Sequence, residues 1–384
     1  QLKVNTIRHT GASSDAVTLA TDGTCIVKST NRSSNLIING SMICAQRGTS
    51  ITAEGFVVDR WDTRYSNLDE APTTTQHALT SSDTGPWEKG FRHSLHLQNG
   101  NQTSGAGASD YLFMGYKIEA QDLASSGWDY TSASSYLTLS FWVKSSVAQN
   151  FYPYFRTKDG TGKLYSWETG SLSANTWTKI TKKIPGASNL QFDNNADEGM
   201  EINIPLWWGG TWTTSGNTLN TWATFDSNDR VPDNTSTWFT TNDATFEITG
   251  VQLEVGDVAT DFEHRSYGDE LQRCMRYYYQ ETYTANYHLV RYSFVSAANE
   301  QAINFDLPVT MRTDPTVTNN GNGNFRLNDY ANDETCNSMT MAQNGTNRVI
   351  LKFAKATSNM TGGKAGVIST EANNDAALYF SAEL

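Results

Sequence analysis

Hydrophobic and polar residues alternate in many short runs along this chain. The clearest run lies near residue 250, where Val251, Leu253 and Val255 alternate with Gln252 and Glu254. A period of two is typical of a strand with one buried face. Further strand-like runs cover residues 36–38, 56–58, 94–98, 111–118, 136–143, 151–155, 176–180 and 246–253, with turns rich in Gly, Asn and Ser between them. We therefore predict an all-β fold, with a jelly-roll sandwich over residues 36–267.

One segment departs from this pattern. Residues 268–280 are compatible with a short linking helix, because Leu271, Met275 and Tyr278 are spaced four and three apart on one face. Gly268 and Asp269 form its candidate N-cap. Strand-like runs resume at residues 287–295, 302–307, 348–353 and 377–382. They predict a second, smaller β-sandwich over residues 281–384.

The first 35 residues contain only two brief strand-like runs, at 2–7 and 16–20. A hairpin of this size is not stable by itself. We predict that residues 1–35 form a segment for attachment or oligomerisation, and a disordered leader is the alternative.

The composition is typical of a β-rich protein, and the net charge argues against some classes of binding partner. Among 384 residues, 18% are charged, below the roughly 25% of typical soluble domains, whereas 11 Trp, 17 Tyr and 16 Phe are present. The net charge of −12 argues against binding to duplex DNA or to anionic membrane surfaces. No apolar run approaches the roughly 20 residues of a membrane span, and the residues from Gln1 onward show no charged-then-apolar signal-peptide pattern. We therefore expect no membrane insertion and synthesis in a cytoplasm.

The four cysteines, Cys25, Cys44, Cys274 and Cys336, form no C-x-x-C pair. Their spacing favours isolated reduced thiols over a disulfide framework or a metal site. We predict no metal site and no cofactor.

Glycan hydrolysis requires two carboxyl groups that flank one bond. The candidates are Asp193, Asp197, Glu198 and Glu201. They occur in a turn-rich region, where acidic side chains are usually solvated, and the chain contains no G-x-S-x-G motif. We therefore predict that the protein is not an enzyme and assign no catalytic residue.

Tryptophans gather in one part of the chain. Trp207, Trp208 and Trp212 lie within six residues, and Trp222 follows. Adjacent residues of a strand face opposite sides, so one of Trp207 and Trp208 is expected to point outward. An exposed indole can stack on a sugar ring, but exposed aromatic residues also mark interfaces. All four are candidates for glycan binding or for an interface.

A second aromatic group lies at the predicted junction. Tyr277, Tyr278 and Tyr279 are flanked by Arg273 and Arg276. Arginine can pair with carboxylates or stack on aromatic rings. We predict that these five residues pack between domains or between subunits.

Several segments resemble a module of tail-fibre and other virion-surface proteins of marine phages, of the cyanophage and pelagiphage kind. They are N-L-I-I-N-G-S-M-I-C-A-Q-R-G-T at 35–49, F-V-V-D-R-W at 56–61, S-F-W-V-K-S at 140–145, and G-V-Q-L-E-V-G-D followed by F-E-H-R-S-Y-G between 250 and 268. The resemblance implies a jelly roll similar to carbohydrate-binding modules, on a phage particle. It also implies an attachment role for residues 1–35 and leaves open a structural Ca²⁺ without assigned ligands.

The resulting hypothesis is a non-enzymatic phage virion protein at the virion surface, either a tail fibre or spike or a capsid-surface fibre subunit. By analogy with such fibres, we expect a homotrimer that binds other virion proteins and contacts host-surface glycan through several weak sites. The alternatives are a purely structural capsid decoration or tail adaptor protein, and a polysaccharide depolymerase.

Overall fold

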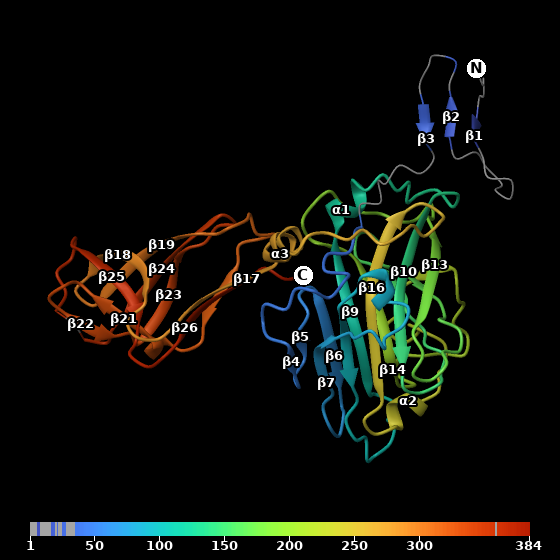
Figure 1. Ribbon diagram of the computed structural model, residues 1–384, viewed down its shortest axis with the longest axis horizontal. Helices are drawn as coiled ribbons and strands as arrows, with labels where there is room; N and C mark the ends of the chain where they lie inside the picture. Colours follow the sequence, from blue (N-terminus) through green and yellow to red (C-terminus); the bar gives the residue numbers. More distant parts are fainter. Residues whose placement is uncertain (1–5, 8–16, 20, 22–24, 28–34, 358) are drawn as a thin grey trace.

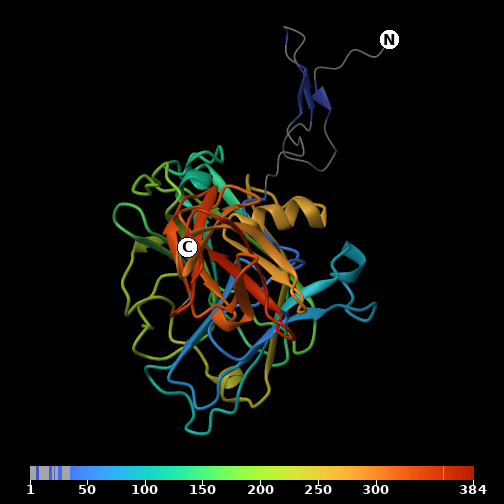
Figure 2. The ribbon, with the colours of Figure 1, turned by 90° about the vertical axis from the view of Figure 1, so that its left-hand side faces the viewer.

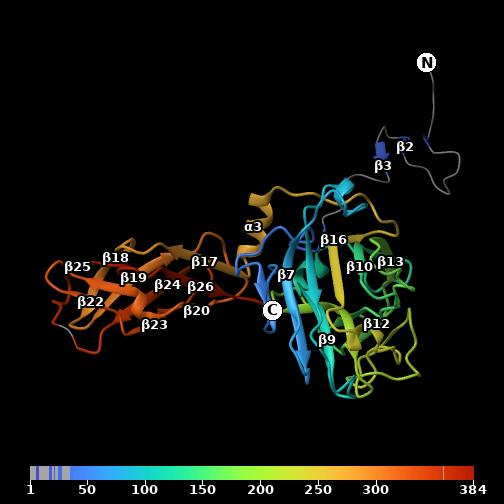
Figure 3. The ribbon, with the colours of Figure 1, turned by 60° about the horizontal axis from the view of Figure 1, so that its bottom comes forward.

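The computed structural model describes residues 6–7, 17–19, 21, 25–27, 35–357 and 359–384. These residues form almost entirely β-structure, so the predicted all-β fold is confirmed. A large β-sandwich and a smaller C-terminal β-unit lie side by side, and helix α3 and the chain end lie between them (Figures 1 and 3). Among the described residues, no helix is long and apolar enough to cross a membrane.

Most of the predicted N-terminal segment lies outside the described residues. Within it, the structure shows β1 (Thr6–Ile7), β2 (Val17–Leu19) and β3 (Cys25–Val27), paired antiparallel in the order β1-β2-β3. The described strands therefore form a three-stranded sheet rather than the predicted hairpin, and the attachment role stays a prediction.

The sandwich consists of two antiparallel sheets in which sequence neighbours are often not spatial neighbours. The six-stranded sheet has the order β13 (Thr178–Pro185), β10 (Tyr136–Ser145), β16 (Thr245–Val255), β8 (His93–Gln98), β7 (Thr73–Ala78) and β4 (Ser50–Ile51). The seven-stranded sheet has the order β15 (Trp222–Thr224), β12 (Lys163–Ser166), β11 (Tyr154–Thr157), β14 (Glu198–Trp208), β9 (Tyr111–Glu119), β6 (Trp61–Ser66) and β5 (Gly55–Phe56). Short helices η1 (Trp87–Lys89), α1 (Ala120–Ala124) and α2 (Thr237–Thr240) lie in the connections.

Alternating apolar residues fill the space between the two sheets. On β10, Leu137, Leu139, Phe141 and Val143 are buried, and on β9, Leu112, Met114, Tyr116 and Ile118 are buried. Each sheet thus turns one side of its pleat to a shared core. The predicted strand at 36–38 is instead an irregular segment whose Leu36 N–H donates to Leu253 O of β16 at 2.9 Å.

The longest strand that the hydrophobic pattern did not predict is β14. Its inner residues Met200, Ile202, Ile204 and Leu206 alternate with polar residues, but Pro205 lies within the run. Proline normally argues against a central strand because it lacks the N–H donor. Here the register with β9 shifts between Pro205 and Trp207, and this bulge accommodates the missing donor.

The linking helix is shorter than predicted. Helix α3 covers Tyr267–Met275, and its N-cap is Ser266, whose hydroxyl accepts from the Asp269 N–H at 3.2 Å. Strand β17 (Tyr278–Tyr283) begins three residues after Met275 and pairs with β26 (Ala376–Ser381). The predicted helical face through Tyr278 is therefore wrong, because cross-strand pairing overrides the local helical spacing.

The C-terminal unit is a second, smaller β-structure, shown in front of the sandwich in Figure 2. Its three-stranded sheet has the order β17-β26-β20, where β20 is Thr316–Asn319. Its seven-stranded sheet has the order β22 (Asp333–Thr335), β21 (Phe325–Asn328), β25 (Ala365–Thr370), β18 (Leu289–Ala297), β19 (Glu300–Asp306), β24 (Arg348–Ala354) and β23 (Ser338–Gln343). The short helix η2 covers Asn322–Asn324. Phe305, Phe325, Phe353 and Phe380 lie in its own apolar core.

The cysteines only partly follow the prediction. Cys44, Cys274 and Cys336 are buried free thiols. However, Cys274 of α3 lies in hydrogen-bond contact with Cys44, so these two are not isolated. The chain fold brings them together across 230 positions of sequence.

Gly250 is the residue on which the centre of β16 depends. It adopts φ of 63° at a bulge between β10 and β16, and an added Cβ would lie 2.5 Å from Phe91 Cζ. We predict that Gly250→Ala lowers the free energy of unfolding by about 2 kcal/mol or more, because it combines backbone strain with overpacking.

Chemical denaturation of both Gly250→Ala and Gly268→Ala checks this prediction. Gly268 lies on α3, where an added Cβ meets nothing within 4 Å, so its alanine variant should be neutral or slightly stabilised. Equal stability of the two variants would show that Gly250 is not required by the fold.

Candidate functional site

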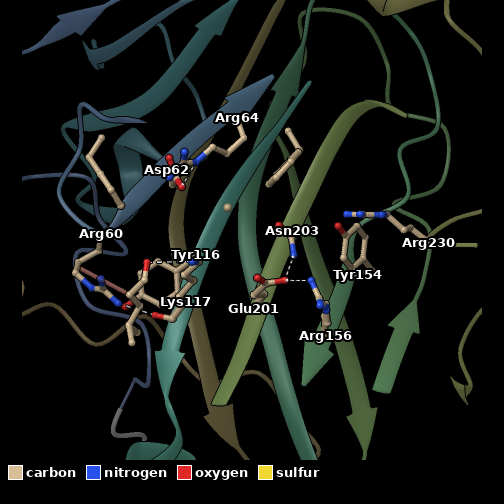
Figure 4. A pocket seen from close by; sticks show the side chains of 14 residues that line it. Arg60, Asp62, Arg64, Tyr116, Lys117, Tyr154, Arg156, Glu201, Asn203 and Arg230 are labelled. Carbon is tan, nitrogen blue, oxygen red and sulfur yellow. Dashed lines mark hydrogen bonds and ion pairs between the residues drawn. The ribbon is translucent and has the colours of Figure 1, made fainter. Parts of the chain in front are cut away.

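The outer face of the seven-stranded sheet carries a groove of about 190 Å³ (Figure 4). Four adjacent strands each contribute one residue to the groove, and each residue pairs directly with the one on the next strand. In order across the sheet they are Asp62 of β6, Gly115 of β9, Asn203 of β14 and Tyr154 of β11. Directly opposed residues of antiparallel strands share a face of the sheet. These residues therefore form one row across the groove.

Gly115 leaves the middle of this row without a side chain. An added Cβ would lie 3.5 Å from Asn203 Oδ1 and 3.5 Å from Phe113 Cε2, which are ordinary contact distances. Crowding therefore does not require glycine here. Its effect is to keep the groove floor open between Asp62 and Asn203, as at positions where another chain approaches the backbone.

Asp62 supplies an unsatisfied acceptor to the groove. Its side chain is 8% exposed, and its Oδ2 accepts from Arg64 Nε at 2.6 Å. Its Oδ1 is buried without a hydrogen-bond partner among the described residues. Burial raises the pKa of this carboxyl, and the hydrogen bond and charge of Arg64 offset the rise only in part. Leaving such an oxygen unpaired is costly, so a donor from solvent or ligand belongs here.

A pair of carboxyl groups lies beside this row. A regular strand would place Glu198 and Glu201 on opposite faces, but the β14–β9 register shifts between Glu198 and Met200. The bulge turns both carboxyl groups to the outer face. Gly199 occupies it, where an added Cβ would lie 2.6 Å from Ala120 Cα.

Lysine and arginine hold this carboxyl pair in place. Lys158 Nζ lies 2.9 Å from Glu201 and 3.3 Å from Glu198, while Arg156 lies 3.6 Å from Glu201. Burial and the neighbouring Glu201 raise the pKa of Glu198. Burial also acts to raise the pKa of Glu201, but the hydrogen bond with Glu198 and the Lys158 charge outweigh it and lower that pKa. The two carboxyl groups therefore titrate as a coupled pair, in which Glu198 keeps its proton to a higher pH than Glu201 does. The prediction that these two glutamates are solvated turn residues is wrong, because both lie on β14 and neither is exposed.

Aromatic rings and Arg230 line one side of the groove. Phe113 stacks on Trp208 with ring centroids 5.2 Å apart. The Arg230 guanidinium lies 4.5 Å from the Trp208 ring centroid and extends from its loop toward Tyr154 (Figure 4). Tyr154 is buried, and burial raises the pKa of its phenol to about 12, so it stays a neutral hydrogen-bonding group.

The C-terminal unit contributes to the opposite end of the groove. Lys117 Nζ donates to Leu384 O at 3.0 Å, and Leu384 lines the groove. Glu383 forms ion pairs with Arg60 at 2.5 Å and with Arg47 at 3.0 Å. The groove is thus a feature of both units, with the sheet as its floor and the last residues as one boundary.

The predicted tryptophans divide between the two sides of the sheet. Trp207 points into the sandwich core and stacks on Phe239 at 5.6 Å, and the partly buried Trp222 packs against the same core. Trp208 points outward but is only 2% exposed, because Tyr111, Phe113, Trp212 and Arg230 cover it. Trp208 and Trp212 therefore support the groove wall, and direct glycan contact by these residues stays a prediction.

The predicted junction residues lie mainly between the two units. Arg276 forms a bidentate ion pair with the buried Glu119 of β9 at 2.7 and 2.8 Å, and the Tyr277 hydroxyl donates to the same carboxylate at 2.5 Å. Burial acts to raise the pKa of Glu119, but these hydrogen bonds outweigh it and lower that pKa.

The remaining members of that predicted group have different surroundings. Tyr278 lies under the Arg47 guanidinium at 3.5 Å. Tyr279 stacks on Phe380 at 5.7 Å within the C-terminal unit, and Arg273 lines a separate pocket together with Asn35 and Asp122. A subunit contact by any of the five stays a prediction.

The groove residues themselves escaped the sequence analysis. Asp62, Gly115 and Asn203 lie far apart in sequence, and strand pairing brings them together. Arg230 joins them from a loop. The available signal was the alternation of polar with apolar residues along β6 and β14. Among the described residues, no group of three or more His, Cys, Asp or Glu side chains is arranged to hold a metal ion. The structural Ca²⁺ that the resemblance left open therefore has no assigned ligands among these residues.

No protein-family model matches the chain, and no curated protein matches it in sequence. Solved structures with a distant likeness include the enzymatically active domain of tailspike protein 4 from bacteriophage CBA120, with 12% identity and a TM-score of 0.30 over 58% of this chain and 21% of that chain. A CBM4 module has 11% identity and a TM-score of 0.29 over 57% of this chain and 98% of that chain. The CBM22-1 xylan-binding domain of Paenibacillus barcinonensis Xyn10C has 10% identity and a TM-score of 0.28 over 60% of this chain and 100% of that chain. Similarity this distant does not indicate what the present chain binds.

The junction beside the groove should respond to pH through Asp59. Its carboxylate is 1% exposed and lies 3.6 Å from Arg47, and burial raises its pKa to about 6. Because the folded pKa exceeds the unfolded one, the stability that comes from protonating Asp59 is present below about pH 4 and is lost as the pH rises through 6.

We predict that Asp59→Asn gains about 3 kcal/mol relative to the wild type between pH 4 and pH 7, since asparagine does not ionise. Unfolding free energies measured across this range check the result. Asp306→Asn, which changes an exposed carboxylate, is the matched control. A pH-independent difference between Asp59→Asn and the wild type would contradict the assignment.

Proposed function

We propose that this protein binds a polysaccharide chain in the groove of the seven-stranded sheet. The observation that carries the proposal is the buried, unpartnered Oδ1 of Asp62 beside the open floor at Gly115. Sugars present many hydroxyl donors, and one of them can satisfy this oxygen. Asn203 and Glu201 add acceptors along the same floor.

The shape of the groove suits an extended ligand. Its principal row runs from Asp62 to Tyr154 across three strand spacings of about 4.8 Å, which together span about 14 Å. This length accommodates a short oligosaccharide segment. The residues of this row lie on strands rather than loops, which favours a preformed floor.

The carboxyl geometry favours binding over hydrolysis. Glycosidases place their two carboxyl groups about 5–9.5 Å apart on either side of the scissile bond. Glu198 and Glu201 instead lie in hydrogen-bond contact, and both are held by Lys158. Such a pair leaves no room for a sugar bond between its members. Release of reducing ends from a bound polysaccharide would restore the depolymerase alternative.

The protein is further proposed to act at a phage virion surface. The support is the resemblance of residues 35–49, 56–61, 140–145 and the segments between 250 and 268 to marine phage fibre proteins. Several copies on one particle would contact host-surface glycan by multivalent binding. A purely structural role would be favoured if Trp207, Trp208 and Trp212 were buried against a neighbouring chain. However, Trp207 and Trp208 are buried within their own chain, which removes that support.

The groove is tested by filling its floor. We predict that Gly115→Leu weakens binding to any polysaccharide retained by the wild type by more than about 1.4 kcal/mol, tenfold in Kd, because the side chain occupies the open floor. The full chain is first screened on an array of bacterial surface glycans and neutral and acidic plant and algal glycans. Hits are then measured by calorimetry.

Gly268→Leu is the matched control, because it adds the same side chain on α3, where nothing lies within 4 Å of the new Cβ. Both variants should unfold at nearly the wild-type temperature. Unchanged glycan binding by Gly115→Leu, or no retained glycan on the array, would refute the proposed function.

The oligomeric part of the proposal has a direct test. Light scattering on the full chain should give three times the monomer mass of 42.5 kDa, because fibre-like virion proteins assemble as trimers. A mass of 42.5 kDa at all concentrations would contradict the homotrimer and favour a decoration protein that docks as single copies.

A further inference from the structure

Basic side chains outnumber acidic ones in the groove. Its lining includes the bases Arg60, Arg64, Lys117, Arg156 and Arg230 and the acids Asp62 and Glu201. The whole chain has a net charge of −12, so this basic character is local. Charges more than about 10 Å apart are largely screened at 0.1 M salt. A ligand in the groove therefore experiences the nearby bases rather than the overall charge.

Most of these bases are already paired with a carboxylate at close range. The pairs are Arg64 with Asp62 at 2.6 Å, Lys117 with Glu198 at 3.2 Å and Arg60 with Glu383 at 2.5 Å. Such pairs have little capacity left for an external anion. The two remaining arginines of the groove, Arg156 and Arg230, have no carboxylate partner at such close range among the described residues.

Arg156 is only loosely paired. Its Nη1 lies 3.6 Å from Glu201, which it shares with Lys158, and its Nε is buried without a hydrogen-bond partner among the described residues. Its guanidinium lies 3.7 Å from the ring centroid of Phe225. Arg156 therefore stacks on Phe225, while its ion pair with Glu201 stays long.

Arg230 has no carboxylate partner within the described part of the chain. Its Nε donates to the backbone oxygen of Ser227 at 3.0 Å, and its guanidinium lies over Trp208, Trp212 and Phe225 at 4.5, 5.1 and 5.6 Å. Phe225 thus contacts both arginines. Stacking on a ring fixes the guanidinium plane. Arg230 also hydrogen-bonds the Tyr154 side chain, and the rest of its N–H edge can meet a planar anion.

We infer that Arg156 and Arg230 form an anion-recognition fork, and that the groove selects an acidic polysaccharide, bearing carboxylate or sulfate groups, over a neutral one. This inference rests on the proposed function and specifies the ligand class of the same groove. Guanidinium groups bind carboxylate and similar oxyanions through paired, charge-assisted hydrogen bonds. Asp62 and Asn203 accept from hydroxyls on the uncharged edges of the sugars.

Paired glycans test the charge requirement with the full chain. The probes are hexagalacturonate, its fully methyl-esterified form, sulfated galactan hexasaccharides and cellohexaose, each measured by calorimetry at 50 and 200 mM NaCl. We expect an acidic probe to bind at least about tenfold more tightly than its neutral counterpart, because a hydrogen bond to a charged group is much stronger than one to a neutral group. Affinity for that probe should fall as salt is raised. The carboxylate and sulfate arms identify which anion the fork prefers.

Variants then assign the selectivity to the fork. Arg230→Gln and Phe225→Leu should each lower affinity for the acidic probe about tenfold or more and reduce its salt dependence, while thermal unfolding stays near that of the wild type. Arg348→Gln is the matched control, because it removes an exposed arginine (63% of its side chain) of the C-terminal unit. Its binding should be unchanged.

Each outcome separates the inference from the proposed function. Equal binding of acidic and neutral probes would overturn the charge selectivity but uphold the glycan groove. Acidic selectivity that survives both Arg230→Gln and Phe225→Leu would overturn the assignment to the fork. No binding to any probe or array glycan would refute the proposed function, and the inference with it.

Discussion

The pleat of strand β9 is the constraint on which the rest of the structure depends. Its inward residues Leu112, Met114, Tyr116 and Ile118 fill the sandwich core, while its outward residues Phe113, Gly115 and Lys117 form the groove floor. Its last residue, Glu119, is the buried carboxylate that binds Arg276 and Tyr277 of the junction. A one-residue slip of β9 would exchange core and groove side chains and displace the junction anchor.

Two bulges in the neighbouring strand β14 interrupt the alternation of inward and outward side chains and so change which residues face the groove. The bulge at Gly199 turns Glu198 and Glu201 to the same face, and the one after Pro205 lets Trp207 enter the core while Trp208 supports the groove wall. The groove consequently combines rigid aromatic backing with partly unsatisfied polar groups. Such a combination is typical of a binding surface, because the folded scaffold already holds the buried polar groups in position before the ligand binds.

The sequence predicted well those features that local patterns determine. The all-β class and most long strands, such as β10, β16 and β24, followed from period-two alternation. Local patterns failed where long-range pairing decides the outcome. Tyr278 joined a strand with β26 instead of extending α3, and Pro205 concealed β14. The groove could not be foreseen for the same reason, since Asp62, Gly115 and Asn203 become neighbours only through strand order.

The position of a bound oligosaccharide tests the central claim most directly. A crystal structure of the full chain with an acidic hexasaccharide should show the ligand over Gly115, with a hydroxyl on Asp62 Oδ1 and an anionic group between Arg156 and Arg230. An oligosaccharide bound on the six-stranded sheet or on the C-terminal unit, with this groove empty, would contradict the account.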